Sequence, residues 1–277
     1  MTVWNAVLLG LVQGIAGFLP ISGSGHIAMF NNLFKLSSLS EGHRLFQVFL
    51  DLAMAAAVCI VYWPELTAMY LELSGMAGFG PLAGREKPRY PGARCFLMIV
   101  LATLPLLLGL PVRGMIAALE GENIFIGVML IFTGFLLYVS DRMKPGKKTE
   151  SSMSISDALI IGLCQCTAVI PGLSRMGVAA SAGIATGLRP DFAINFSFLL
   201  ALPSSLGAAI LAIIDASADG VDWGSVPAYL IGTAAALLSG VAAIHLMRYI
   251  GRRFKLGTFA YYCWVVGVLS IVLHLIF

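Results

Sequence analysis

Six long apolar stretches alternate with polar segments along the chain. They lie near residues 46–63, 96–112, 123–140, 192–214, 226–247 and 258–277. A helix of about 20 apolar residues crosses the hydrocarbon core of a bilayer. The pattern therefore predicts six transmembrane helices.

Two further segments, residues 1–45 and 156–190, have a different pattern. Each has one apolar arm, a break rich in Gly, Pro and Ser, and a second, shorter arm. Inside a membrane, non-helical backbone is tolerated only where it lines a cavity or is buried in protein. We therefore interpret both segments as re-entrant helical hairpins. The predicted fold is an all-α polytopic membrane protein with six transmembrane helices and two such hairpins.

The two hairpin segments repeat each other about half the chain apart. The first contains LGLVQGIA at residues 9–16, and the second contains IGLCQCTA at residues 161–168. One constant offset pairs Gly10 with Gly162, Gln13 with Gln165, Ser22 with Ser174 and Gly25 with Gly177. This similarity indicates an internal duplication, with residues 1–150 as the first repeat and residues 151–277 as the second.

The composition agrees with a membrane protein. Of the 277 residues, 59% are hydrophobic and 11% are charged, and the mean hydropathy is +0.92. These values exclude a water-soluble domain. The five cysteines have no zinc-type spacing and mostly lie in apolar stretches, so we interpret them as packing residues.

The charged residues predict the orientation in the membrane, because short cytoplasmic loops collect Lys and Arg. The loop with three aspartates has no Lys or Arg, whereas three other loops are basic, with Arg85, Lys87, Arg89 and Arg94, with Arg142, Lys144, Lys147 and Lys148, and with Arg248, Arg252, Arg253 and Lys255. Six spans place the basic loops in the cytoplasm and both termini outside. The hairpins then enter from opposite sides, which makes the halves an inverted repeat. The basic loops indicate topology and no nucleic-acid partner.

Arg175 is the leading candidate for ligand binding. An inverted-repeat membrane protein is expected to bind its ligand near the midplane, where the repeats meet. An arginine in a segment at membrane depth is costly unless it faces a cavity or a partner. Its guanidinium can bind a phosphate through two parallel hydrogen bonds. Arg175 therefore predicts an anion site at the second hairpin.

The glycines and serines of the two elbows have two interpretations. Backbone N–H groups near Gly25, Gly172 and Gly177 can bind phosphate at helix starts. Ser22, Ser24 and Ser174 are either helix caps or phosphate contacts. Aromatic residues near the predicted span ends are expected to be interfacial anchors, namely Trp4, Trp63, Trp223, Tyr261 and Tyr262.

The two elbows resemble the signature motifs of a known family. Residues 13–26 (QGIAGFLPISGSGH) and 171–177 (PGLSRMG) look like the two motifs of the BacA/UppP undecaprenyl-pyrophosphate phosphatases. Residues 196–203 (FSFLLALP) are similar to the family's segment after the second motif, and the likeness extends through most of the chain. The resemblance implies a bacterial inner-membrane enzyme that removes a phosphate from the C55 lipid diphosphate and so recycles the carrier lipid for cell-wall sugars. It also implies the inverted-repeat hairpin fold.

The motifs depart from the family pattern where that pattern carries acids. The family's first motif has two acidic residues, or Gln in place of the first, where this chain has Gln13 and Gly17. A Glu that is common just before the FSF segment is Asn195 here, and the related position in the first half is Gln47. Two hydroxyl positions of the second motif are apolar. By this comparison the chain is a divergent member.

Diphosphate hydrolysis commonly uses a divalent cation held on carboxylates, together with Arg and a positioned nucleophile and base. The chain keeps Arg175 and lacks the acids, so we predict no metal site, with Mg²⁺ or Ca²⁺ as a cofactor only if the chain is active. Asp51 is a substitute metal ligand or a partner of Arg175. In an active enzyme His26 and Ser22 would be catalytic. Otherwise His26 satisfies a backbone carbonyl of the elbow.

Two functions are compatible with this pattern. The first is a binding protein for polyprenyl phosphate or diphosphate that is impaired as a phosphatase and extends to a lipid carrier or flippase. The alternative is an active undecaprenyl-diphosphatase. A lipid-sensing pseudoenzyme and a homodimer are left open. The predicted substrate-binding residues are Arg175, Ser174, Gly172, Ser24, Gly25, Gly177, Gln13, Gln165, Gln47, Asn195 and Asp51.

Overall fold

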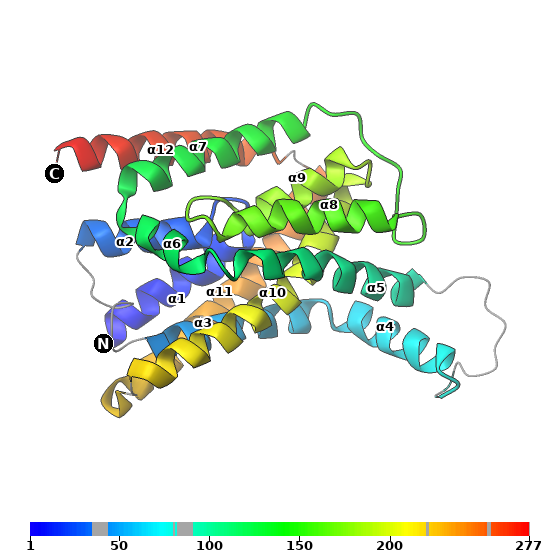
Figure 1. Cartoon of the computed structure of the whole chain (residues 1–277), viewed down its shortest axis with the longest axis horizontal. Helices are drawn as coiled ribbons and strands as arrows, with labels where there is room; N and C mark the ends of the chain where they lie inside the picture. Colours follow the sequence, from blue (N-terminus) through cyan, green and yellow to red (C-terminus); the bar gives the residue numbers. More distant parts are fainter. Residues whose placement is uncertain (35–43, 80, 82–90, 220–221, 254–255, 277) are drawn as a thin grey trace.

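The computed structural model describes residues 1–34, 44–79, 81, 91–219, 222–253 and 256–276, and in these ranges the fold is all-α (Figure 1). An isolated bridge between Lys148 and Leu188 is the one β-type pairing in the described ranges. The predicted basic residues Arg85, Lys87, Arg89 and Lys255 lie outside these ranges, as do residues 35–43 of the first hairpin segment.

The α-helices follow the predicted order of apolar segments. Their bounds are α1 Val3–Phe18, α2 Gly23–Phe34, α3 Arg44–Val61, α4 Trp63–Met76, α5 Pro91–Thr103, α6 Arg113–Ala117, α7 Asn123–Ser140, α8 Ile155–Cys166, α9 Arg175–Ala185, α10 Pro190–Asp219, α11 Val226–Arg253 and α12 Thr258–Ile276. Short 3₁₀ turns extend α5 (η2, Leu104–Gly109), follow α6 (η3, Ala118–Gly121), follow α8 (η4, Thr167–Val169) and precede α11 (η5, Trp223–Ser225).

The prediction of six spans is confirmed. Among the described residues, six helical stretches are long and apolar enough to cross a membrane: 44–61, 91–109, 123–140, 190–217, 223–251 and 258–276. Each coincides with a predicted stretch to within a few residues. This makes the chain a multi-pass membrane protein.

The helices pack in pairs that match across the two halves of the chain. Helix α1 packs on α11, and α8 packs on α5; α3 packs on α10, and α7 packs on α12. In Figure 1, α7 and α12 lie side by side along the upper edge, and α4 extends away from the bundle at the lower right. The α1–α11 and α8–α5 pairs thus relate the same elements of the two halves in reverse order, which is what a duplication would produce.

Glycines of the repeated motif allow these helix pairs to approach closely. A Cβ on Gly10 of α1 would overlap the carbonyl of Gly232 on α11, and a Cβ on Gly162 of α8 would overlap the carbonyl of Ala102 on α5. Small residues are the usual contact of closely packed membrane helices. Gly10 and Gly162 therefore have equivalent roles in the two helix pairs.

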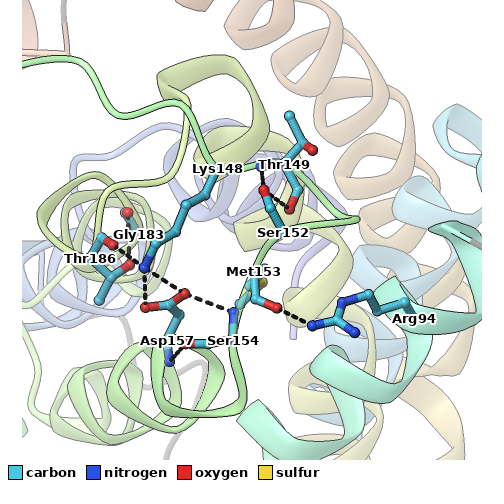
Figure 2. Close-up of polar contacts among 9 residues, drawn as sticks. All are labelled: Arg94, Lys148, Thr149, Ser152, Met153, Ser154, Asp157, Gly183 and Thr186. Atoms are coloured by element: carbon cyan, nitrogen blue, oxygen red, sulfur yellow. Dashed lines mark hydrogen bonds and ion pairs between the residues drawn. The ribbon is translucent and has the colours of Figure 1, made fainter.

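Lys148 connects the start of α8 to the end of α9, as Figure 2 shows. Its Nζ donates hydrogen bonds to the two carboxylate oxygens of Asp157 at 2.8 and 2.9 Å and to the backbone carbonyl of Thr186 at 2.9 Å. Asp157 lies in the first turn of α8, and Thr186 caps the end of α9. The first turn of α8 and the last turn of α9 therefore lie next to each other, both bonded to Lys148.

The two helix–elbow–helix units are α1 with α2 and α8 with α9, and in each unit the two helices contact each other. Their re-entry into a membrane from opposite sides stays a prediction, because no membrane is present. The division into repeats at residues 1–150 and 151–277 also stays a prediction.

The core lies between the elbows and the long helices. Phe18 at the end of α1 and Tyr62 after α3 both contact the ring of Phe198 on α10, with ring centroids 5.9 and 6.0 Å apart. All three side chains are buried. This aromatic cluster packs α10 against the first hairpin, and two of its members, Phe18 and Phe198, line a cavity.

Candidate functional site

The two elbows meet at a pair of glycines. A Cβ on Gly25 would lie 2.9 Å from both the Cα and the backbone nitrogen of Gly172. Gly172 has a φ of +95°, and Ser22 in the first elbow has a φ of +69°. A non-glycine residue in this left-handed region costs about 1 to 3 kcal/mol, and such strain is concentrated at functional sites. The two elbows therefore meet in the fold, and both contain backbone in the left-handed region.

In the first elbow, Ser22 organises the start of α2. Its Oγ accepts a hydrogen bond from the N–H of Gly25 at 3.3 Å. Its backbone carbonyl accepts two, from the N–H of His26 at 3.2 Å and from Nδ1 of the same histidine at 2.8 Å. Ser22 thus serves the capping role, and Ser24 beside it is exposed.

The ring of His26 is bonded on both sides. Because the Ser22 carbonyl can only accept, Nδ1 must carry the proton of this bond. In the neutral ring Nε2 then accepts from the hydroxyl of Tyr262, 2.9 Å away on α12. The two rings also stack, with centroids 5.7 Å apart. The nitrogen that would act as a base is therefore occupied by Tyr262, which the sequence predicts only as an interfacial anchor.

In the second elbow, Thr133 of α7 holds the backbone. Its hydroxyl donates to the carbonyl of Gly172 at 2.9 Å and accepts from the N–H of Ser174 at 3.3 Å. The Oγ of Ser174 caps α9 by accepting from the N–H of Gly177 at 3.1 Å. Thr133 lies in a uniformly apolar span, and nothing in its sequence context marks it as a site residue.

A cavity lies beside the second elbow, between α1, α3, α8, α9 and α10. Its lining includes Gly17, Met54, Gln165, Arg175, Ser197 and Phe198. Arg175 is the first residue of α9. Within the described part of the chain, its guanidinium has no hydrogen bond or ion pair. The cavity therefore holds a cation whose hydrogen-bond donors are available to a ligand.

Gln165 adds a second unpaired polar group to this cavity. Its side chain is 3% exposed, and its Oε1 is buried without a hydrogen-bond partner among the described residues. A buried polar atom without a partner costs about 1 to 3 kcal/mol. Only a bound group that donates a hydrogen bond to Oε1 would remove that cost, whereas a phosphate oxygen would accept from the Nε2 of the same amide. Its repeat counterpart Gln13 is equally buried and lies on α1.

Asp51 lies close enough to Arg175 for an electrostatic interaction between their charges. Its carboxylate is buried in α3 and accepts a hydrogen bond from Nε2 of Gln47, one turn earlier, at 3.1 Å. No ion pair joins Asp51 to Arg175 among the described residues, so both predicted roles for Asp51 stay predictions.

Asn195 lies elsewhere. Its Oδ1 accepts a hydrogen bond from the hydroxyl of Tyr62 at 2.8 Å, and it lines a separate polar cavity with Asp191 and Arg248. Arg248 stacks on the Tyr62 ring at 5.0 Å. The structure therefore brings together Arg175, Gln165 and the elbow residues, but it does not add Asn195 to them.

The residues at the Arg175 cavity do not fit a divalent cation. No Asp, Glu or His is present in its lining. In the described ranges, no three His, Cys, Asp or Glu side chains cluster as metal ligands would. Mg²⁺ and Ca²⁺ prefer several oxygen ligands that include carboxylates. The donor set suits an anion.

A helical bundle of six apolar spans, with two elbows meeting beside a cavity lined by Arg175, defines a polytopic membrane protein. Comparison with known sequences names the family. The profile described as "Bacitracin resistance protein BacA" matches residues 6–269. The chain therefore belongs to the BacA family.

Curated relatives align along nearly their full length. "Undecaprenyl-diphosphatase" from Methanosphaera stadtmanae is 31% identical, covering 100% of this chain and 99% of the relative. Proteins with the same description from Halothermothrix orenii and Syntrophotalea carbinolica are 33% and 35% identical. They cover 100% and 96% of this chain, and 100% and 97% of those relatives.

Proposed function

We propose that this chain binds the phosphate headgroup of a polyprenyl lipid, such as undecaprenyl diphosphate, in the cavity at Arg175. The single observation that carries the proposal is the guanidinium of Arg175, which lines the cavity and has no hydrogen bond within the described residues. An arginine at membrane depth is costly unless it has a partner. A phosphate satisfies its charge and its planar donors together. The description of the relatives as undecaprenyl-diphosphatases supports this lipid class.

We propose further that hydrolysis is impaired. Transfer of a phosphoryl group needs charge compensation and a positioned nucleophile. The cavity offers the charge of Arg175, the amide of Gln165 and the hydroxyl of Ser197, with no carboxylate in its lining. The hydroxyl of Ser197 donates to the carbonyl of Ile194 at 2.7 Å. A headgroup held in this way is positioned for binding and, in an inverted repeat, for transfer between leaflets.

An active undecaprenyl-diphosphatase is the second candidate function. The shared description of the relatives favours it. His26 also favours it, because this buried histidine lies in the first elbow next to Ser22, and histidine is the most common general base. In that enzyme Tyr262 would have to release Nε2 of His26 before the ring could accept a proton.

The proposed location is the bacterial inner membrane, with both termini outside. The six apolar helices support a location in a membrane. The basic residues of the loop between α7 and α8, among them Arg142, Lys144 and Lys147, support its cytoplasmic side. A homodimer stays a prediction.

Headgroup binding is tested with purified protein in nanodiscs and undecaprenyl diphosphate. We expect Arg175→Ala to weaken binding about 10- to 100-fold, the value of one or two hydrogen bonds between charged groups. Arg189→Ala is the matched control, because Arg189 is exposed and pairs with Asp191 at 2.6 Å. Equal affinity of both variants would contradict the proposal.

Phosphate release in the same samples, with and without Mg²⁺ or Ca²⁺, separates the two candidate functions. Binding without release supports an impaired phosphatase. Cation-dependent release that His26→Ala abolishes would establish the enzyme instead. The carrier role is tested in liposomes with labelled polyprenyl phosphate on one leaflet, where no protein-dependent change of leaflet would exclude it.

A further inference from the structure

The polar cavity at Arg248 lies where two spans end. Its lining residues are Asp191, Ile194, Asn195, Arg248 and Gly251. The first three belong to the start of α10 and the other two to the end of α11. These helix ends are also the ends of the spans 190–217 and 223–251. Lipid headgroups lie just outside the hydrocarbon core that a span crosses. The cavity is therefore expected at the level of the headgroups.

The guanidinium of Arg248 is positioned, yet it has donors to spare. Its Cζ lies 5.0 Å from the ring centroid of Tyr62, which is within the range of a cation–π contact. Its hydrogen bond to Glu65, from Nη2 to Oε1, is long at 3.4 Å. A guanidinium carries five N–H donors. Arg248 can therefore bond a phosphate without losing a strong contact.

Asn195 adds an amide to the same cavity. Its Oδ1 accepts from the hydroxyl of Tyr62 at 2.8 Å. Within the described ranges its Nδ2 has no hydrogen bond. Tyr62 therefore positions both donor groups of the cavity, the Asn195 amide through its hydroxyl and the Arg248 guanidinium through its ring. Phosphate oxygens are acceptors that suit both.

Asp191 provides an acceptor in the cavity. Its carboxylate receives two hydrogen bonds from Arg189, at 2.6 and 2.7 Å. A carboxylate has about four lone-pair sites, so it can accept from a further donor. The charges of Arg189 and Arg248 balance those of Asp191 and Glu65. A polyprenyl diphosphate would add several negative charges beside these two acids, at an electrostatic cost. A headgroup with one negative and one positive charge keeps the balance.

The space in the cavity is limited. Its volume is about 50 Å³, which corresponds to roughly three to five water molecules at about 10 to 15 Å³ each. A phosphate group with a small ammonium group beside it matches this space. A trimethylammonium group is larger and has no N–H to donate to Asp191.

We propose that this cavity binds the phosphoethanolamine headgroup of a phospholipid of the surrounding bilayer. The phosphodiester accepts hydrogen bonds from Arg248 and from Nδ2 of Asn195, and the primary ammonium donates to Asp191. The bound lipid thereby joins the end of α11 to the start of α10. This site is separate from the cavity at Arg175, and the inference does not depend on the proposed function.

The test is native mass spectrometry of the purified protein with phosphatidylethanolamine, phosphatidylcholine and phosphatidylglycerol of identical acyl chains. We expect wild type to bind phosphatidylethanolamine about tenfold more tightly than either of the others, the value of one hydrogen bond between charged groups. Asp191→Asn should remove the preference over phosphatidylcholine. Arg248→Ala should weaken binding of phosphatidylethanolamine about 10- to 100-fold.

Arg142→Ala is the matched control and should bind as wild type does. Arg142 also stacks on a tyrosine, with its Cζ 3.8 Å from the ring centroid of Tyr138, but it does not line this cavity. Equal affinity for the three lipids, or equal effects of the two arginine variants, would overturn the inference. Displacement of phosphatidylethanolamine by farnesyl diphosphate would also overturn it, because the cavity would then accept the polyprenyl headgroup.

If Arg248→Ala fails to fold, thermal unfolding of the wild type gives a second test. Dihexanoyl forms of the three lipids are added to the protein in detergent. A ligand that binds only the folded state raises the unfolding temperature. The ethanolamine lipid should raise it more than the other two lipids do, and equal shifts would overturn the inference.

Discussion

The backbones of Gly25 and Gly172 pack against each other so closely that a Cβ on Gly25 would lie 2.9 Å from the Cα of Gly172. They come from the two motifs of the duplicated sequence, and their contact brings the Ser22–His26 elbow against the segment that leads into Arg175. No side chain fits between them. The geometry of the proposed headgroup site therefore depends on both residues being glycine.

We predict that Gly25→Ala destabilises the protein by about 1 to 3 kcal/mol, the usual cost of overpacking. The added methyl group would also displace the second elbow and weaken headgroup binding. Thermal unfolding in detergent measures the first effect. Gly207→Ala on α10 is the control, because a Cβ there meets nothing within 4 Å. A Gly25→Ala protein as stable as this control would contradict the contact.

Lys148→Met should lower the free energy of unfolding by about 1 to 3 kcal/mol, because it removes hydrogen bonds to a charged partner. It leaves the carboxylate of Asp157, 7% exposed, without its cation. Limited proteolysis should then cut near the open end of α8 and α9. Lys147→Met removes one positive charge at the exposed neighbouring residue and should leave the free energy of unfolding unchanged. Equal stability of the two variants would refute the bridging role.

The surroundings of Asp157 lead us to predict that the protein loses stability in acid. Burial favours a higher pKa, but hydrogen bonds from Lys148 and Ser154 outweigh it, and the pKa of Asp157 is lowered. The carboxylate therefore stabilises the fold fully above its unfolded pKa, about 3.9, and loses this contribution as pH falls through the folded value. Unfolding temperatures measured from pH 7 down to pH 3 should fall less steeply in Asp157→Asn than in wild type. Parallel curves would be the contrary result.

Tyr262→Phe removes the hydroxyl that bonds Nε2 of His26. We expect a loss of about 1 kcal/mol in stability, typical of one hydrogen bond, and no gain in phosphate release. Tyr261→Phe is the matched control, since Tyr261 is exposed and contacts Trp264 through its ring. Release that appears on freeing His26 would favour the active enzyme.

The spans and elbows could be predicted because their signals are local. A run of apolar residues specifies a spanning helix wherever it packs, and all six predicted stretches are confirmed. The two elbows were detectable because each is a Gly, Pro and Ser break in an apolar stretch, whereas the contact between Gly25 and Gly172 was not predicted. Gln47 and Asp51 meet because four residues separate them on one helix face.

The contacts that the sequence did not predict join distant segments through packing. His26 and Tyr262 are 236 positions apart, and Thr133 bonds an elbow 39 positions away. Asn195 is part of the same α10 as Ser197, yet it faces Tyr62 rather than the Arg175 cavity. Which side of α10 each residue occupies depends on how that helix is rotated against α3, and no local pattern records that rotation.

The most direct test of the headgroup site is an experimental structure of the protein with undecaprenyl diphosphate in nanodiscs. We predict a phosphate oxygen about 2.8 Å from a guanidinium nitrogen of Arg175, the usual length of such a charged hydrogen bond. The amide of Gln165 should bond the same headgroup. A headgroup bound at Arg248, or anywhere that leaves Arg175 without contact, would contradict the account.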